Sequence, residues 1–145
     1  MSTTLDLKVE LEDWCASYVT AFEAFDLQGI GAHWAFPAMV VSGKRQLIMQ
    51  DAAAFARNTG ALVAFYERQN ARKVTRKIIA AHPMADATAA MQVQDVISTL
   101  DQQPITQWVS AYVLRKTNSA WRAIFADASG EATAWAERGT PLGSK

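Results

Sequence analysis

The apolar pattern of the first quarter of the chain predicts one long amphipathic helix. Between residues 6 and 25, apolar side chains recur at spacings of three and four, the repeat of one face of an α-helix. The stripe consists of Leu7, Leu11, Trp14, Cys15, Tyr18, Val19, Phe22 and Phe25. We therefore expect the helix to pack along its whole length, with Cys15 as a small buried side chain and not as a nucleophile.

The segment after this helix predicts a short helical turn. The long helix should end near Gly29, and one further turn through Trp34 is expected before Pro37, because proline disfavours helix at the residue before it. Asp26 is expected to hydrogen-bond local backbone. His33 and Trp34 would sit on adjacent turns, with Trp34 the better candidate for the wall of an interior pocket.

A hairpin and a second long helix follow. Residues 38–41 and 45–50 have the character of short strands, and Gly43 supplies the turn between them. Asp51 suits the N-cap of a helix over residues 52–69.

From residue 71 onward the period of the apolar residues changes from helical to twofold. This alternation predicts strands, and the breaks between them are two to five residues long, as in antiparallel hairpins. The predicted strands are residues 72–82, 87–99, 105–117 and 120–129. The chain beyond Thr133 is expected to be a short tail, disordered at its last few residues.

Helices followed by an antiparallel meander predict an α+β fold. We expect one domain over residues 1–145, with a curved antiparallel or mixed sheet that forms a cone and with the N-terminal helices on its concave face. A cone of this kind often leaves an interior pocket.

The composition is that of a packed globular protein, with 50% hydrophobic and 19% charged residues. Fourteen basic residues balance fourteen acidic ones, so nucleic acid is not an expected partner. The basic run over residues 67–77 is expected to be a solvated rim. The chain has no apolar leader and no long apolar window, which leads us to expect a cytoplasmic protein without a membrane partner.

Metal and cofactor sites are not expected. The two histidines, His33 and His82, are far apart in sequence, and the single cysteine forms no ligand cluster with them. No glycine-rich phosphate loop or nucleophile elbow is present either.

Asp95 is the first polar candidate for a site. It shares strand parity with Met91, Val93 and Ile97, and a carboxylate on an apolar face needs a partner or a raised pKa. Asp95 is therefore either a pocket acid or a residue at the solvated rim of a two-faced strand.

Two further groups of side chains share strand faces. They are Trp108, Ser110 and Tyr112 on one strand, and Trp121, Phe125 and Asp127 on the next. These groups could form an aromatic ligand box, or they could belong to the core or a dimer interface, because the alternate residues 109, 111 and 113 are apolar as well.

The order of elements and the segment YVTAFEAFDLQGIGAHWA resemble the nuclear transport factor 2-like, or SnoaL-like, superfamily. Within it, the resemblance is nearest to the ketosteroid isomerases. This resemblance implies a homodimer built through the outer sheet faces and a pocket between the first helix and the inner face. The isomerase would use a tyrosine, a carboxylate base and a protonated second acid in that pocket.

Carried over residue by residue, the resemblance matches the tyrosine to Tyr18, the base to Ser42 and the second acid to Ser110. The pKa of a serine hydroxyl is far too high for it to act as a free general base near neutral pH, unless another group activates it. We therefore expect no steroid isomerase activity by that mechanism.

The sequence favours a protein that binds a small apolar or aromatic molecule. One alternative is a cofactor-free isomerase, dehydratase or hydrolase of a small hydrophobic substrate, with Asp95 or Asp127 as acid or base and Tyr18 as donor. Another is a dimeric protein-interaction module without catalysis. The residues expected to line the pocket are Tyr18, Phe22, Trp34, Asp95, Trp108, Ser110, Tyr112 and Phe125.

Overall fold

A computed structural model describes residues 4–143 as four helices and six strands. The helices are α1 (Thr4–Glu23), α2 (Leu27–Gly31), α3 (Ala52–Arg68) and α4 (Ser129–Glu137). The strands are β1 (Trp34–Ser42), β2 (Arg45–Met49), β3 (Lys73–Ala85), β4 (Thr88–Ser98), β5 (Pro104–Thr117) and β6 (Ala120–Asp127).

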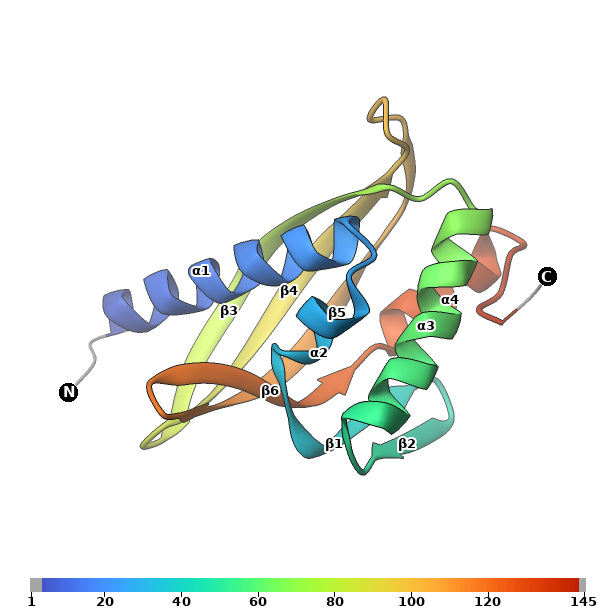
Figure 1. Ribbon diagram of the computed structural model, residues 1–145. Helices are drawn as coiled ribbons and strands as arrows, with labels where there is room; N and C mark the ends of the chain where they lie inside the picture. Colours follow the sequence, from blue (N-terminus) through green and yellow to red (C-terminus); the bar gives the residue numbers. More distant parts are fainter. Residues whose placement is uncertain (1–3, 144–145) are drawn as a thin grey trace.

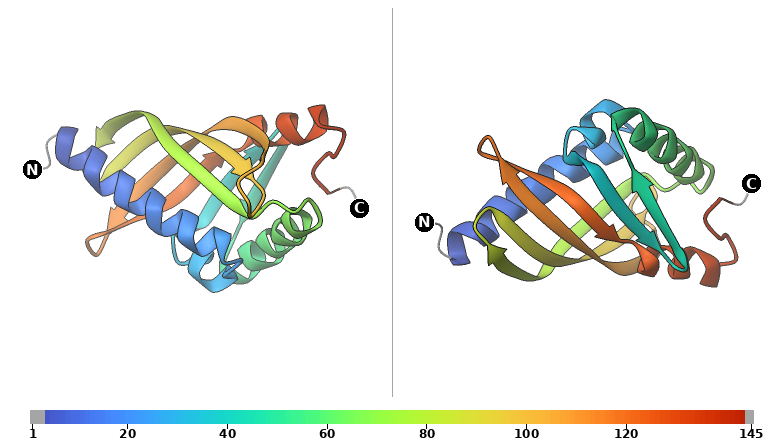
Figure 2. Two further views of the ribbon diagram at one scale, coloured as in Figure 1. Left: turned by 90° about the horizontal axis from the view of Figure 1, so that it is seen from above. Right: turned by 90° about the horizontal axis from the view of Figure 1, so that it is seen from below.

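The six strands form one curved, unclosed mixed sheet in the order β2-β1-β6-β5-β4-β3. All neighbouring pairs are antiparallel except β1 and β6, which run parallel. Helix α1 lies across the sheet on its concave side, and α3 stands at one end beside α4 (Figures 1 and 2). The predicted α+β fold, with a curved sheet and helices on its concave face, is confirmed.

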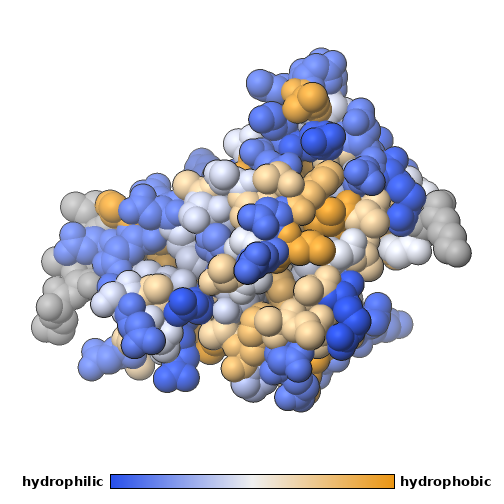
Figure 3. Space-filling view, in the orientation of Figure 1, coloured by the Kyte–Doolittle hydropathy of each residue, from blue (hydrophilic) through white to orange (hydrophobic). Residues whose placement is uncertain are grey.

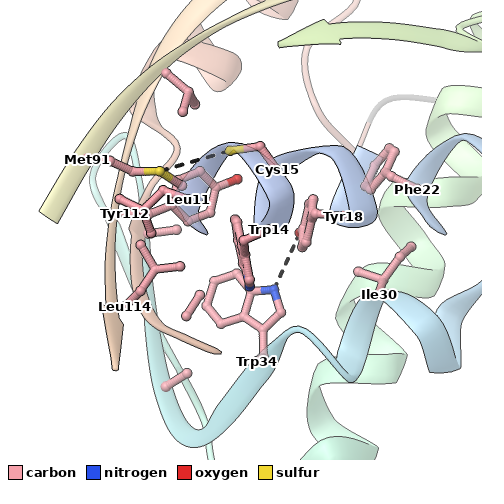
Figure 4. Packing of buried hydrophobic residues seen from close by; sticks show 14 of the residues in the cluster. Leu11, Trp14, Cys15, Tyr18, Phe22, Ile30, Trp34, Met91, Tyr112 and Leu114 are labelled. Atoms are coloured by element: carbon pink, nitrogen blue, oxygen red, sulfur yellow. Dashed lines mark hydrogen bonds between the residues drawn. The ribbon is translucent and has the colours of Figure 1, made fainter. Parts of the chain in front are cut away.

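Helix α1 buries the predicted apolar stripe from Leu7 to Phe22 against the inner face of the sheet, with Val19 only partly buried (Figure 4). The predicted end of this helix near Gly29 is wrong, because α1 ends at Glu23 and Phe25 lies beyond it. Leu11 is fully buried, and Trp14 stacks on Tyr18 with the ring centroids 5.0 Å apart. Cys15 is buried, with its Sγ 4.0 Å from Sδ of Met91 on β4, as expected for a small apolar side chain. No helix among residues 4–143 has both the length and the apolar character needed to cross a bilayer.

Asp26 caps the short helix α2, and its carboxylate accepts a hydrogen bond from the backbone N–H of Gly29 at 3.1 Å. The predicted placement of Trp34 on this helix is wrong, because α2 ends at Gly31 and Trp34 is the first residue of β1. Pro37 likewise lies inside β1 and does not precede it. The β1–β6 register shifts between Trp34 and Met39, and a residue that lacks an N–H is tolerated at such an irregularity.

The hairpin and the second helix follow the prediction. Gly43 has a φ of 62° in the turn between β1 and β2, a conformation that glycine adopts without strain. The Asp51 carboxylate accepts a hydrogen bond from the backbone N–H of Ala54 at 2.8 Å and caps α3. The meander β3 to β6 is also as predicted, except that β3 continues through Pro83 to Ala85. Because β3 is the last strand of the sheet, a proline there can face away from the ladder.

The expectation of a tail after Thr133 is wrong, because residues 129–137 form helix α4. Trp135 on this helix is fully buried, with its ring centroid 5.1 Å from that of Phe65 and 6.0 Å from that of Trp108. Helix α4 therefore closes the end of the sheet between α3 and β5. The expected disorder of the last few residues concerns positions 144–145, which lie outside the described residues.

Candidate functional site

A cavity of about 70 Å³ lies between the inner face of the sheet and the helices, and its lining residues come from α1, α3, α4 and the strands β3, β4, β5 and β6. Five aromatic side chains supply much of its wall: Tyr18, Phe22, Tyr66, Trp108 and Tyr112. Four polar side chains also line it: Arg76, Asp95, Ser110 and Glu131. Figure 3 shows apolar surface between α1 and α3. Each of these helices contributes a half-buried residue to the lining of the cavity, Val19 from α1 and Leu62 from α3.

The structure brings six of the predicted pocket residues to this cavity: Tyr18, Phe22, Asp95, Trp108, Ser110 and Tyr112. Trp34 is buried but does not line it. Its ring lies beneath Tyr18, and its Nε1–H donates to the Tyr18 hydroxyl at 3.4 Å (Figure 4). Trp34 thus supports a residue of the wall instead of forming the wall.

Phe125 and Asp127 do not belong to the cavity, and the prediction that they share a face with Trp121 is wrong. The register between β5 and β6 shifts between Val113 and Leu114, so one extra residue of β6 reverses the alternation of its side chains. Ala126 pairs with Tyr112 and lines the cavity, whereas Phe125 pairs with Val113 on the outer face. The Asp127 carboxylate accepts a hydrogen bond from the backbone N–H of Ser129 at 3.0 Å, just before α4.

Asp95 is a cavity residue, not a rim residue, and it is paired with Arg76. The guanidinium donates from Nε to Oδ1 at 2.8 Å and from Nη2 to Oδ2 at 2.9 Å, a two-point contact between directly opposed residues of β3 and β4. Nη2 also donates to the Tyr112 hydroxyl at 3.0 Å. The exposed fractions of the two charged side chains are 6% and 5%, so their charges balance each other inside the protein.

The expectation that the basic run is a solvated rim is wrong for Arg76. This residue shares parity with Val74 and Ile78, which are partly buried, and that alternation was the available signal for an inward arginine. Its guanidinium lies over the rings of Tyr18 and Tyr112, 5.3 and 5.1 Å from their centroids. Among the described residues no hydrogen-bond acceptor reaches its buried Nη1.

Glu131, in the first turn of α4, is the cavity residue that sequence reasoning missed. Its Oε2 accepts hydrogen bonds from the Tyr66 hydroxyl at 2.5 Å and from Trp135 Nε1–H at 3.2 Å. Burial raises the pKa of the Glu131 carboxyl to about 7, although both hydrogen bonds lower it. The sequence offered one weak sign of this helix: Glu131 and Trp135 are four residues apart in an alanine-rich segment. No apolar stripe accompanied that spacing.

The three tyrosines of the cavity remain neutral across the physiological range, because burial raises the pKa of each hydroxyl: Tyr18, Tyr66 and Tyr112. They can act there as hydrogen-bond donors or acceptors. The catalytic set expected for an enzyme, Tyr18 with Asp95 or Asp127, is not assembled as such, since Asp95 is held by Arg76 and Asp127 lies elsewhere.

Ser110 lies in the cavity, as the resemblance implies, but Ser42 does not. Ser42 ends β1 and borders a separate surface hollow that it shares with Arg45 and Leu47. The cavity therefore has no side chain from the position that the isomerase uses for its base.

Within residues 4–143 no three histidine, cysteine, aspartate or glutamate side chains converge as a metal site would require. The His33 ring lies between local groups, with Nδ1 2.8 Å from the Gly29 carbonyl oxygen and Nε2 2.8 Å from Ser17 Oγ. His82 is exposed on β3.

Comparison with solved structures places the fold among known ones. An NTF-2 like protein of unknown function from Shewanella oneidensis MR-1 superposes with a TM-score of 0.66 at 10% identity, covering 83% of this chain and 96% of that one. A protein of unknown function with a cystatin-like fold from Nostoc punctiforme PCC 73102 gives 0.65 at 15% identity, covering 86% and 90%. A ketosteroid isomerase-like protein from Erwinia carotovora atroseptica SCRI1043 gives 0.62 at 12% identity, covering 82% and 92%.

At these identities the likeness shows the fold alone. No curated protein matches the chain. Residues 9–131, most of the chain, match the family described as NTF2-like protein (DUF6841). The chain thus belongs to this NTF2-like family, and the resemblance to the superfamily that its sequence suggested is confirmed.

Proposed function

We propose that this protein binds a compact small molecule in the cavity on the concave side of its sheet. The observation that carries the proposal is the composition of the wall: an aromatic lining interrupted by an ion pair and by Glu131, all buried. Ligand pockets are mostly apolar with a few polar groups that fix the orientation of the ligand. A site that served packing alone would have little need of buried ionisable groups, which are costly to desolvate.

The size of the cavity limits the ligand. A volume of about 70 Å³ holds roughly five to seven water molecules, since each water needs 10–15 Å³ of such volume. A ligand buried in it would have a similar number of non-hydrogen atoms, and a larger one would extend between α1 and α3. The size favours compact ligands over the rigid skeleton of a steroid.

The test uses the strand β5, on which neighbouring residues face opposite sides. Water-soluble fragments would be screened by ligand-observed NMR and thermal shift against the unchanged chain and against Ser110→Leu, which places methyl groups in the cavity. Gln107→Leu is the control. Gln107 is exposed, so this substitution adds the same leucine side chain outside the cavity. A fragment at 100 times its dissociation constant stabilises the protein by about 2.7 kcal/mol.

We expect fragments that stabilise the unchanged chain and Gln107→Leu but not Ser110→Leu. Unfolding curves without ligand would verify that Ser110→Leu is folded. Fragments that stabilise all three chains equally, or no stabilisation by any fragment, would contradict the proposal. Catalysis is a separate question, and it needs turnover of a substrate that such a screen would identify.

A further inference from the structure

The charges around the cavity do not balance. Arg76 and Asp95 neutralise each other through their two-point contact, whereas Glu131 is hydrogen-bonded only to neutral groups. No salt bridge involves Glu131 among the described residues, and none of their hydrogen-bond donors reaches its Oε1. With Glu131 ionised, the cavity carries one negative charge that no cation of the described residues pairs with, on a residue that is 9% exposed.

We propose that the cavity is a site for a small organic cation, an alkylated ammonium compound whose charge lies against the Glu131 carboxylate and the neighbouring aromatic rings. This inference rests on the proposed function, since it names the class of ligand for the same cavity.

The aromatic wall supplies the second half of such a site. An ammonium group is attracted to the negative face of an aromatic ring, an attraction used in the recognition of quaternary ammonium ligands, and a nearby carboxylate adds a charge–charge attraction. Tyr66, which is hydrogen-bonded to the acid, lies edge to face with Phe22 with the ring centroids 5.0 Å apart, and Phe22 and Trp108 line the same cavity. The guanidinium of Arg76 already lies over Tyr18 and Tyr112, which shows that this interior accommodates a planar cation on aromatic faces.

Size and charge favour a small organic cation over a small anion as the ligand. Roughly five to seven non-hydrogen atoms fill the cavity, about the size of a trimethylammonium group with a short polar arm. An anion would find the unpaired Nη1 of Arg76, yet that guanidinium is already neutralised by Asp95, and the cavity is negative when Glu131 is ionised. Anion binding therefore costs a further like-charge repulsion from Glu131.

Cation binding should be linked to the proton on Glu131. An adjacent cation favours the carboxylate, lowers its pKa from about 7 and releases a proton where the free protein is protonated. The other titratable groups around this cavity are Tyr18 on α1, Tyr66 on α3, Arg76 on β3, Asp95 on β4 and Tyr112 on β5, and Arg45 on β2 borders the hollow on the other side of Glu131. The tyrosines stay neutral because burial raises the pKa of each hydroxyl, and Glu131 is the group to which we assign the released proton.

The experiment is isothermal titration calorimetry with three probes: choline, its neutral carbon isostere 3,3-dimethylbutan-1-ol, and acetate. Titrations at pH 6 and pH 8, in buffers of different ionisation enthalpy, count the protons released. The variant is Glu131→Gln, whose amide oxygen can still accept from Tyr66 and Trp135, and the control is Glu137→Gln, an exposed glutamate of the same helix.

We expect choline to bind more tightly than its isostere, with release of nearly one proton at pH 6 and about tenfold higher affinity at pH 8, because a carboxyl with a pKa near 7 is about nine-tenths protonated at pH 6. Glu131→Gln should lose both the preference and the proton release, and Glu137→Gln should keep them. Equal binding of choline and its isostere, unchanged choline binding by Glu131→Gln, preference for acetate, or no binding of choline would overturn the inference. Fragments that still depend on Ser110 would then leave the proposed function standing with a different ligand class.

Discussion

Glu131 makes the stability of the protein depend on pH in an unusual direction. A carboxyl that keeps its proton to about pH 7 when folded, and only to about 4.5 when unfolded, favours the unfolded state increasingly as the pH rises between these values. The full effect is about 3 kcal/mol, and it is present above pH 7. Most paired acids act the other way and lose stability in acid.

The variant Glu131→Gln should therefore gain stability relative to the unchanged chain as the pH rises. We expect the difference in unfolding free energy between the variant and the unchanged chain to shift by about 3 kcal/mol in favour of the variant from pH 4.5 to pH 8. The reason is that the amide carries no charge to desolvate. Urea unfolding of both chains at several pH values would measure this. Parallel pH profiles would mean that Glu131 does not titrate in this range.

At the residue scale, alternation along strands was informative where a strand was regular. It placed Asp95 on the buried face but left open whether its carboxylate reached water. The structure answers this question, because Asp95 is buried and paired with Arg76, 19 residues earlier on the neighbouring strand. Arg76 was hidden by its basic neighbours Arg72, Lys73 and Lys77, of which Arg72 and Lys77 are exposed. A pair of opposed side chains depends on strand register, which composition does not reveal.

At the scale of elements, two of the errors have clear local causes. The extra residue in β6 exchanges the faces of Ala126 and Phe125, and a twofold pattern contains no sign of a bulge. Helix α4 has one large buried apolar residue, Trp135, and no side-chain hydrogen bond at its N-cap, so both usual signals of a helix were weak. Its position depends on tertiary contact, with Phe65 among others.

The close packing of α4 on β5 leads to a prediction about two glycines. A Cβ at Gly130 would lie 2.4 Å from the Val109 carbonyl oxygen, which is backbone and cannot move aside easily. A Cβ at Gly60, within α3, would meet only Leu27 Cδ1 at 3.6 Å. We expect Gly130→Ala to destabilise the protein by about 1–3 kcal/mol and Gly60→Ala to stabilise it by about 0.5–1 kcal/mol.

Chemical unfolding of the two variants would measure both effects, and each serves as the control for the other, since both are glycine-to-alanine changes in helices. Gly130→Ala should also weaken fragment binding, because α4 carries Glu131 to the cavity. A Gly130→Ala chain as stable as the unchanged one would show that α4 is not seated against β5 as described.

At the scale of the whole molecule, the order of elements was sufficient for the fold. Helices followed by a strongly patterned meander have few ways to bury one face, and the curved sheet with α1 on its concave side is the one observed. The composition of the cavity was less predictable, because its walls come from residues as distant as Tyr18 and Glu131. Such a site depends on the completed fold and on the seating of α4.

The outer face of the sheet supports a last prediction, that two copies of the chain associate through it. Val109 of β5 and Ile79 of β3 have exposed fractions of 44% and 52%, and Val113 and Phe125 are only partly covered. Apolar side chains gathered on an open sheet face are typical of protein interfaces, and a twofold dimer buries the same patch on both copies. We propose a homodimer of about twice 15.9 kDa.

Sedimentation equilibrium at micromolar concentration would test this with two matched variants. Val109→Lys places a charge on the outer sheet face, whereas Val9→Lys places it on the exposed side of α1, across the sheet, where the valine is 50% exposed. We expect Val109→Lys to shift the mass toward the monomer, because each copy would bury an unpaired lysine at the interface, and Val9→Lys to leave the dimer intact. A monomer for the unchanged chain, or equal dissociation of both variants, would place the association elsewhere or exclude it.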